Sequence, residues 1–420
     1  MSPNSTITIP NLHRSILANG ITLIVVENQA ADIISGRFFF KKAGTIIEKP
    51  EQSGLAHLVS AVITKGTKNL SALEIAEKIE SIGAGLGADA SADYFALSLK
   101  TVSADFPTML ELLGEIMRSP VFPESEVELE RKLTLQGIKS QKEQPFNVAF
   151  NELRQQMYPQ HPYGISVLGT ETSVANLTRQ DLQQYHQTYF RPDNLVISLS
   201  GRITQEQGID LISRVFGDWK NPDTPSPTAS VTSPTVNPNQ AEIIQDTQQS
   251  IVMLGYLGTN VDNADYPVLK LISTYLGNGL SSRLFVELRE KRGLAYDVSA
   301  FFPTRLDIAP FITYMGTAPT NTQIAIDGLS TEVERLTKET LNESELQGAK
   351  NKLLGQYALG KQTNGEIAQT YGWYETLGLG VEFDRNFQTA IPPITPERIQ
   401  EVANKYLSKP YISLVKPEDK

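Results

Sequence analysis

A segment rich in Pro, Thr, Ser and Asn near the middle of the chain is the strongest constraint on its fold. Residues 221–240 read NPDTPSPTASVTSPTVNPNQ and contain almost no apolar side chains. This composition is typical of an exposed, semi-extended linker, because it offers little apolar surface to bury and its prolines favour extended backbone. The 420-residue sequence therefore predicts two domains of comparable size, residues 1–220 and 241–420.

The first half begins with patterns typical of strands and continues with helical patterns. Asn19-Gly20 lies between two apolar runs, which is a strong β-hairpin signal. Ser71 followed by Glu74 is a capping-box pattern, so a helix is expected to start there. Further strands are predicted within residues 35–48, 94–103 and 185–204, and further helices at residues 54–67, 107–118 and 123–142.

The second half shows the same order of elements without a close sequence repeat. This repetition predicts an α+β protein of two homologous domains, each with a mixed, mostly antiparallel sheet and helices packed on one face. Strands are predicted at residues 248–259 and 295–317, and helices at residues 266–277, 281–293, 320–336, 342–360 and 395–407.

Composition limits the classes of function. The formal net charge of −10 argues against nucleic acid or an anionic membrane as the main partner. The absence of cysteine excludes disulfides and thiolate metal sites. No apolar run approaches the length of a membrane span, and the first twenty residues lack a signal-peptide pattern. The sequence therefore predicts a cytoplasmic location.

The string GLAHLVSAVITKGT, residues 54–67, places His57 three and four residues before Ser60 and Ala61. It resembles the inverted zinc motif H-x-x-E-H of the pitrilysin (insulinase) family of zinc peptidases. In that motif two histidines on one helix face bind zinc, and the glutamate acts on the zinc-bound water. Ser60 stands where the glutamate belongs, and Ala61 stands where the second histidine belongs.

The resemblance also implies a third ligand, a glutamate in a segment like ERKLTLQGIKSQKEQP, where this chain has Gly137. Together these positions leave one imidazole and no general base, which predicts that this chain binds no metal. Read without the family, His57 is a helix histidine that faces a cavity or makes a hydrogen bond. Rescue of a metal site by residues elsewhere is a further alternative, although His13, His161 and His186 show no chelating spacing.

The resemblance extends over nearly the whole chain through HPYGISVLGT at residues 161–170, YHQTYFRPDNL at 185–195 and GNGLSSRLFVELREKRGLAYDVSA at 277–300. It points to the branch of paired bacterial subunits related to the mitochondrial processing peptidase. In that branch two chains, each of two domains, close around a peptide chamber. The residues matching the arginine and tyrosine that project into the chamber opposite the zinc are Arg289 and Tyr296.

These two residues also have ordinary interpretations. Arg289 lies in the charged run ELREKR, which is typical of a solvated helix face, and Tyr296 reads as a half-buried strand aromatic. The resemblance implies that Gly277, Asn278 and Gly279 form a substrate-binding loop, although they could only end a helix. It also implies that an edge strand near residues 86–97 pairs with extended peptides.

The sequence thus predicts a non-catalytic subunit of a heteromeric zinc peptidase. Its partner would be a homologous H-x-x-E-H subunit that holds the zinc, and its substrates would be extended peptides. The chain alone could form a homodimer. A structural or peptide-holding protein without a catalytic role is the main alternative, and an independently active metallopeptidase is a weaker one.

Overall fold

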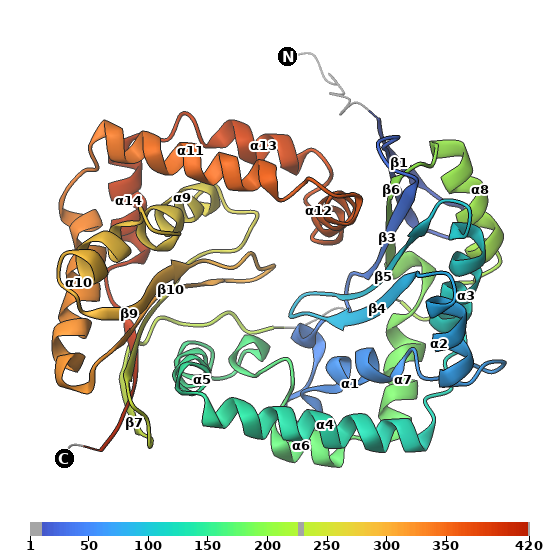
Figure 1. The fold of residues 1–420 in the computed structure, drawn as a ribbon, viewed down its shortest axis with the longest axis horizontal. Helices are drawn as coiled ribbons and strands as arrows, with labels where there is room; N and C mark the ends of the chain where they lie inside the picture. The colour runs from blue at the N-terminus through green and yellow to red at the C-terminus, as the bar shows by residue number, and fades with distance from the viewer. Residues whose placement is uncertain (1–10, 226–230, 419–420) are drawn as a thin grey trace. The chain divides into compact units, whose positions relative to one another are not determined.

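The computed structural model describes residues 11–225 and 231–418 (Figure 1). Its helices and strands form two compact units, each built around one sheet. This architecture confirms the predicted α+β class with two domains of sheet and helices. Unit 1 consists of Met1–Leu135, Val167–Ser230 and Gly360–Phe383, and unit 2 consists of Gln136–Ser166, Val231–Leu359 and Asp384–Lys420.

The sheet of unit 1 has the strand order β1-β2-β6-β3-β5-β4. Neighbouring strands are antiparallel except β2 and β6, so the sheet is mixed and mostly antiparallel, as predicted. The predicted hairpin is confirmed, with Gly20 at φ 96° between β1 and β2. The strands are β1 (Leu12–Ile16), β2 (Thr22–Glu27), β3 (Ile33–Phe40), β4 (Gly85–Ala90), β5 (Phe95–Val102) and β6 (Leu195–Gly201).

Successive side chains of this sheet point into two different cores, because side chains alternate along a strand. On β3, Phe38 and Phe40 lie in the larger core, among apolar residues of α1, α2, α3, α7 and α8. Phe39 lies in a smaller core on the other face, with Tyr371 of α12. The helices are α1 (Leu55–Val62), α2 (Ala72–Glu80), α3 (Phe106–Arg118), α4 (Glu124–Glu143), α6 (Glu171–Asn176), α7 (Arg179–Tyr189), α8 (Gln205–Phe216) and α12 (Asn364–Thr376).

A glycine lets α12 approach the sheet of unit 1. A methyl group at Gly372 would lie 2.5 Å from the ring of Phe39 and 2.8 Å from Cβ of Ser198. Contacts this short do not occur between packed carbon atoms, which prefer separations of about 3.5–4.0 Å. The missing side chain at Gly372 is therefore a condition for the packing of α12 on β3 and β6.

The sheet of unit 2 has the order β7-β11-β8-β10-β9, and only β7 and β11 pair in parallel. Figure 1 shows α5 and α10 on opposite sides of this sheet. A methyl group at Gly255 of β8 would lie 2.6 Å from Sδ of Met157 on α5. The elements are β7 (Gln240–Ile244), β8 (Ser250–Leu257), β9 (Ala295–Phe301), β10 (Pro310–Thr317), β11 (Tyr411–Lys416), α5 (Pro145–Met157), α9 (Tyr266–Gly277), α10 (Thr322–Lys338), α11 (Glu343–Leu359), α13 (Phe383–Ala390) and α14 (Pro396–Tyr406).

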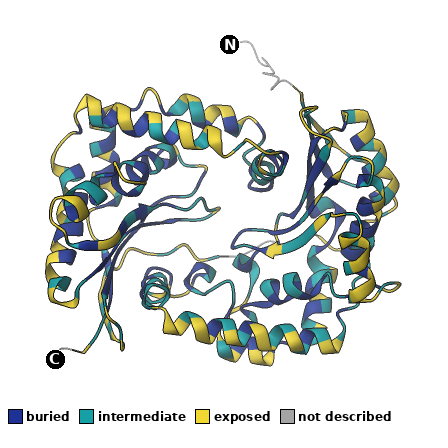
Figure 2. Cartoon of the chain, in the orientation of Figure 1, coloured by how far each residue is buried: buried dark blue, intermediate teal, exposed yellow. Residues whose placement is uncertain are grey.

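The central strands are largely buried, whereas most helices keep an exposed side (Figure 2). This distribution is what amphipathic helices packed on a sheet produce. Within the described part of the chain, no helix combines the length and the apolar character that a membrane span requires.

The compact units do not coincide with the two sequence halves. The first half contributes α5 to unit 2, and the second half contributes α12 to unit 1. Each helix makes its closest sheet contacts in that unit, through the glycine contacts described above. In the predicted linker, residues 221–225 and 231–239 form no helix or strand, and residues 226–230 lie outside the described residues.

The helices with clear periodicity are confirmed at α3, α10, α11 and α14, and the capping box of α2 is present. The sequence analysis missed α5, α6, α8, α12 and α13. The buried side of α12 consists largely of small, polar and tyrosine residues, so it carries no aliphatic stripe of the kind that signals a helix.

The close contact of α12 with the sheet predicts that adding a methyl group at Gly372 destabilises the fold. Gly372→Ala should lower the free energy of unfolding by about 1–3 kcal/mol, because the added Cβ collides with Phe39 and Ser198. Chemical denaturation measures the change. Gly355→Ala is the matched control, since no atom lies within 4 Å of a Cβ there; it should be neutral or stabilising. Equal destabilisation by both changes would contradict the packing argument.

Candidate functional site

The three residues of α1 that match the zinc motif H-x-x-E-H lie on one side of the helix. Leu55, Leu58, Val59 and Val62 are buried against unit 1. His57, Ser60 and Ala61 are partly exposed, as the spacing of a chelating helix requires. The scaffold of the motif is therefore present.

A buried glutamate holds the start of this helix. Gly54, the N-cap residue, has φ 92°, and a methyl group there would lie 2.6 Å from the carbonyl oxygen of Leu168. Because glycine has no capping side chain, the carboxylate of Glu48 takes this role. It accepts the N–H of Gly54 at 2.9 Å and the N–H of Ala56 at 2.6 Å. Burial raises the pKa of Glu48 to about 8, although both backbone hydrogen bonds lower it.

Two carboxylates lie within electrostatic reach of His57. Burial lowers the pKa of His57, while Asp89 on β4 and Glu130 on α4 raise it. Burial raises the pKa of Asp89, and His57 lowers it. Oε1 of Glu130 also lies 3.3 Å from Nζ of Lys65. The imidazole thus has an acidic environment, but one of its carboxylates already has a lysine partner.

The residues at this place do not fit a catalytic zinc ion. The hydroxyl of Ser60 donates to the carbonyl oxygen of His57 at 2.7 Å, and Ala61 offers no donor atom. Gly137 lies two turns beyond Glu130 on α4 and has no side chain. Among the residues described, no group of three or more His, Asp or Glu side chains is arranged to hold a metal. A catalytic zinc requires three protein ligands.

The other histidines are engaged in separate places. Nε2 of His13 lies 3.4 Å from Glu27. His161 precedes the short 3₁₀ helix η3 (Pro162–Gly164); its Nδ1 accepts the N–H of Tyr163, and its Nε2 lies 3.1 Å from Asp307. His186 donates to the carbonyl oxygen of Met117, and burial lowers its pKa to about 4. Each ring has a structural partner.

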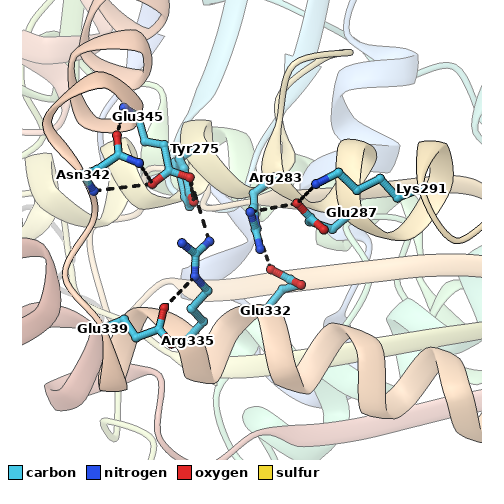
Figure 3. Close-up of polar contacts among 9 residues, drawn as sticks. All are labelled: Tyr275, Arg283, Glu287, Lys291, Glu332, Arg335, Glu339, Asn342 and Glu345. Atoms are coloured by element: carbon cyan, nitrogen blue, oxygen red, sulfur yellow. Dashed lines mark hydrogen bonds and ion pairs between the residues drawn. The ribbon is translucent and has the colours of Figure 1, made fainter.

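Arg289 lies on a π-helix, η5 (Phe285–Glu290), where the sequence predicted an ordinary helix. π-helical turns are rare and often occur at functional sites. Figure 3 shows the ion pairs at the start of η5. Arg283 forms ion pairs with Glu287 at 2.8 Å and with Glu332 of α10 at 2.7 Å. The exposed guanidinium of Arg289 lies 4.9 Å from the ring of Phe285.

Tyr296 lies at a bulge in the edge strand β9. Ala295 pairs with Thr317 and Asp297 pairs with Gly316, so Tyr296 is the extra residue between the two pairs. Bulges redirect side chains and are frequent next to active sites. The side chain of Tyr296 is 62% exposed, which makes it more open than the half-buried aromatic of the alternative interpretation.

The turn at Gly293 joins η5 to β9. Gly293 has φ 63°, and its N–H donates to the carbonyl oxygen of Arg289 at 3.1 Å. Within residues 11–225 and 231–418, neither Arg289 nor Tyr296 has a side-chain hydrogen bond or ion pair. Both are therefore available to a ligand, and their predicted roles stay predictions.

The residues of the predicted substrate-binding loop, 277–279, end α9 and connect it to the following turn. Gly277 ends α9, where a methyl group would lie 1.7 Å from the backbone nitrogen of Ala300. The side chain of Asn278 donates to Gln356 at 2.6 Å. Gly279 has φ 80° in the following turn. These residues close the end of α9 onto β9, and peptide binding by them stays a prediction.

The sequence analysis missed three residues around the motif: Glu48, Asp89 and Glu130. Glu130 precedes Gly137 by seven residues, so two helical turns place both on the same side of α4. This spacing was the signal that could have found it. Nothing local marks Glu48 or Asp89, because their positions depend on how the chain folds back onto α1.

Two family models match the chain. The model described as Insulinase (Peptidase family M16) matches residues 23–171, and the model described as Peptidase M16 inactive domain matches residues 176–353. Uncharacterized zinc proteases are similar along most of their length. YmxG of Bacillus subtilis is 25% identical over 97% of this chain and 98% of that protein. A protein of Rickettsia felis is 26% identical over 93% and 91%.

Solved structures agree with these matches. The peptidase M16 inactive domain from Pseudomonas fluorescens has a TM-score of 0.90 and 26% identity, covering 97% of this chain and 99% of that chain. A protease from Helicobacter pylori has a TM-score of 0.91 at 23% identity, over 97% and 100% of the two chains. The latter similarity concerns the fold alone.

The buried carboxyl of Glu48 predicts a pH dependence of stability. An acid whose pKa is about 8 in the folded state, against 4.5 ordinarily, binds its proton more tightly when folded. Stability from this group is therefore greatest below about pH 4.5 and falls as the pH rises to about 8. Relative to Glu48→Gln, the wild type should lose a few kcal/mol over this range, measured by urea unfolding. Exposed Glu51→Gln is the control, and a parallel pH profile of wild type and Glu48→Gln would contradict the prediction.

The side chains around α1 predict that the wild-type chain binds no zinc and that restoring the missing ligands creates a zinc site. The wild-type chain should retain no stoichiometric zinc after dialysis, as measured by atomic absorption. The triple variant Ser60→Glu, Ala61→His, Gly137→Glu restores the ligand types of the motif and should retain about one zinc per chain. Adding His57→Ala to that variant should abolish retention. Stoichiometric zinc on the wild-type chain would show that the fit argument is wrong.

Proposed function

The chain belongs to the M16 (insulinase) family of peptidases, and on this premise we propose that it is a non-catalytic subunit of a heteromeric zinc peptidase. A homologous subunit with an intact H-x-x-E-H motif would hold the zinc. This chain would supply Arg289 and Tyr296 to that site and help enclose an extended peptide. The observation that carries the proposal is that, among the described residues, neither side chain has a hydrogen bond or an ion pair, in a chain whose own motif face offers too few metal ligands.

The two side chains have complementary chemistry. The guanidinium of Arg289 is a planar fork that can hold a carbonyl or carboxylate of a peptide. The phenol of Tyr296 can donate a hydrogen bond to the oxygen that becomes negatively charged when water attacks a peptide carbonyl. The ion pairs of Arg283 and the backbone turn at Gly293 support the elements that carry them. This support restricts the motion of the backbone that carries the two hydrogen-bond donors.

The edge strand β4 supports the peptide-binding part of the proposal. Among the described strands, β4 pairs with β5 alone, so its other edge has backbone groups that can pair with an added strand. A Cβ at Gly85 or Gly87 would meet no atom closer than 3.5 Å. The strand also packs beside α1, so a peptide added there would lie next to the motif helix.

This edge strand equally favours a second function. A chain that only holds or encloses peptides would use β4 and would need neither Arg289 nor Tyr296. The two functions differ in what this chain contributes to a homologous zinc subunit. As a subunit of the peptidase it would contribute hydrogen-bond donors for catalysis, whereas as a peptide-holding protein it would contribute only the bound peptide.

The distinguishing experiment combines this chain with a homologous H-x-x-E-H subunit from the same organism and follows cleavage of a fluorogenic peptide. The mixture should be active and each chain alone inactive. Tyr296→Phe should lower kcat about 10²–10³-fold, because it removes one donor to the transition state. Arg289→Ala should lower kcat/KM by a comparable factor.

Arg292→Ala is the matched control, since Arg292 is an exposed arginine in the same turn. Its activity should equal that of the wild-type mixture. Unchanged activity of the Arg289 and Tyr296 variants in a confirmed complex would favour the peptide-holding function. Peptide cleavage by this chain alone would contradict both.

A further inference from the structure

Three cationic side chains gather at one end of the sheet of unit 2. Arg154 comes from α5, Lys270 from α9, and Arg305 from the loop between β9 and β10. Arg305 lies close enough to the other two to lower the pKa of each by repulsion, although burial is the larger cause for both. We call this group the Arg154–Lys270–Arg305 cluster.

The packing of α5 shows how unusual Arg154 is. One row of α5 side chains packs aromatic on aromatic: Phe146 lies 5.0 Å from Tyr314, and Phe150 lies 5.9 Å from Phe301. The next residue in this row is Arg154, one turn later. Its guanidinium lies 5.4 Å from the ring of Phe150. The apolar row therefore ends in a charge, where another apolar group would continue the packing.

Arg154 lacks hydrogen-bond partners suited to a buried guanidinium. Nη2 donates to the side chain of Asn151 at 2.6 Å. Nε is buried and has no acceptor among the residues described. Burial and, to a smaller extent, the charge of Arg305 together lower the pKa of Arg154 to about 10. A buried donor without an acceptor is unfavourable and requires an explanation.

The other two cations have aromatic and carbonyl neighbours. Arg305 lies 5.6 Å from the ring of Tyr163 and donates to the carbonyl oxygen of Thr304 at 3.3 Å. Nζ of Lys270 donates to the carbonyl oxygen of Phe302 at 2.6 Å, and burial with the charge of Arg305 lowers the pKa of Lys270 to about 8. These neighbours hold the cations in place without neutralising them.

Asp307, two residues after Arg305 in the sequence, has other partners. Asp307 lies 3.1 Å from Nε2 of His161, and its other oxygen accepts the N–H of Ile308 at 2.7 Å. Over the described ranges of the chain, none of the three cations forms an ion pair with a carboxylate. Folding thus brings like charges together and leaves them without a counter-charge, which is unfavourable unless an anion binds there.

We propose that the Arg154–Lys270–Arg305 cluster binds a carboxylate group of a peptide. The inference rests on the proposed peptide-binding function, because a peptide is the ligand that brings a carboxylate. Two guanidinium groups match a carboxylate through paired N–H donors, and aromatic walls exclude the water that would weaken the contact. The carboxylate comes either from the C-terminus of a peptide or from an Asp or Glu side chain.

The first test uses a pair of small probes that differ only in charge. N-acetylalanine carries a free carboxylate, and N-acetylalaninamide is its neutral counterpart. At equal ionic strength, N-acetylalanine should raise the thermal midpoint of the whole chain and N-acetylalaninamide should not. Arg305→Gln should abolish the difference, and exposed Arg385→Gln should retain it. An equal response to both probes, or an unchanged response in Arg305→Gln, would overturn the site.

The thermal midpoint of Arg305→Gln without ligand tests whether Arg305 has only a structural role. Arg305→Gln removes one of the like charges, so the variant without ligand should be at least as stable as the wild type. If Arg305→Gln unfolds the chain, the cluster is structural and the inference is wrong. Arg305→Lys keeps the charge but loses the fork, so it should retain only part of the response.

The second test separates the two sources of the carboxylate by fluorescence anisotropy with labelled peptides. One peptide has a free C-terminus, a second is its C-terminal amide, and a third is the amide with one internal Glu. The cluster should favour a carboxylate-bearing peptide over the amide by about tenfold or more, and the favoured peptide identifies the source. Equal affinity for all three would overturn the site but leave the proposed function intact. Failure of every peptide to bind, while N-acetylalanine still stabilises the chain, would contradict the proposed function and support the anion site.

Discussion

Two helix-on-sheet contacts, each made possible by a glycine, determine how this chain divides into units. Gly372 lets α12 approach Phe39 of β3, and Gly255 of β8 lets Met157 of α5 approach that strand. Each contact covers the second face of a sheet, so neither sheet exposes an apolar surface there. Because α5 and α12 come from opposite halves of the sequence, the units exchange one helix each. The core of each unit therefore depends on residues far apart in the chain.

The structure keeps the framework of a metal-binding helix while its chemistry is absent. Glu48 supplies the cap that Gly54 lacks, and the buried side of α1 packs as an ordinary amphipathic helix. The exposed side offers His57, a serine bonded to its own helix, and an alanine. Preservation of the scaffold without ligands is consistent with a role in which α1 shapes a surface. A peptide is the ligand that the proposed function assigns to that surface.

Unit 2 contains several side chains with polar groups that have no polar partner among the described residues. Arg289 and Tyr296 project from a π-helix and a bulge, two irregularities that present side chains outward. Arg154 and Arg305 instead belong to a partly buried cluster, in which the charge of Arg305 lowers the pKa of Arg154 and neither has a carboxylate ion pair among the described residues. Both observations point to ligands with oxygen acceptors, and a peptide provides them as carbonyl and carboxylate groups.

By itself the sequence determined the α+β class, the mixed sheets, the Asn19-Gly20 hairpin and the capped start of α2, because turns, caps and periodicity are local. It also determined which metal-ligand positions are empty, since a serine, an alanine and a glycine cannot ligate zinc as the motif requires. Only the tertiary structure decided that α5 and α12 exchange between halves. It alone placed Glu48, Asp89 and Glu130 around α1, put Tyr296 on a bulge and brought Arg154 to Arg305. These features depend on tertiary packing and strand register, in which a residue's position is set by neighbours from other elements of the chain, and apart from the spacing of Glu130 to Gly137 no local pattern indicates them.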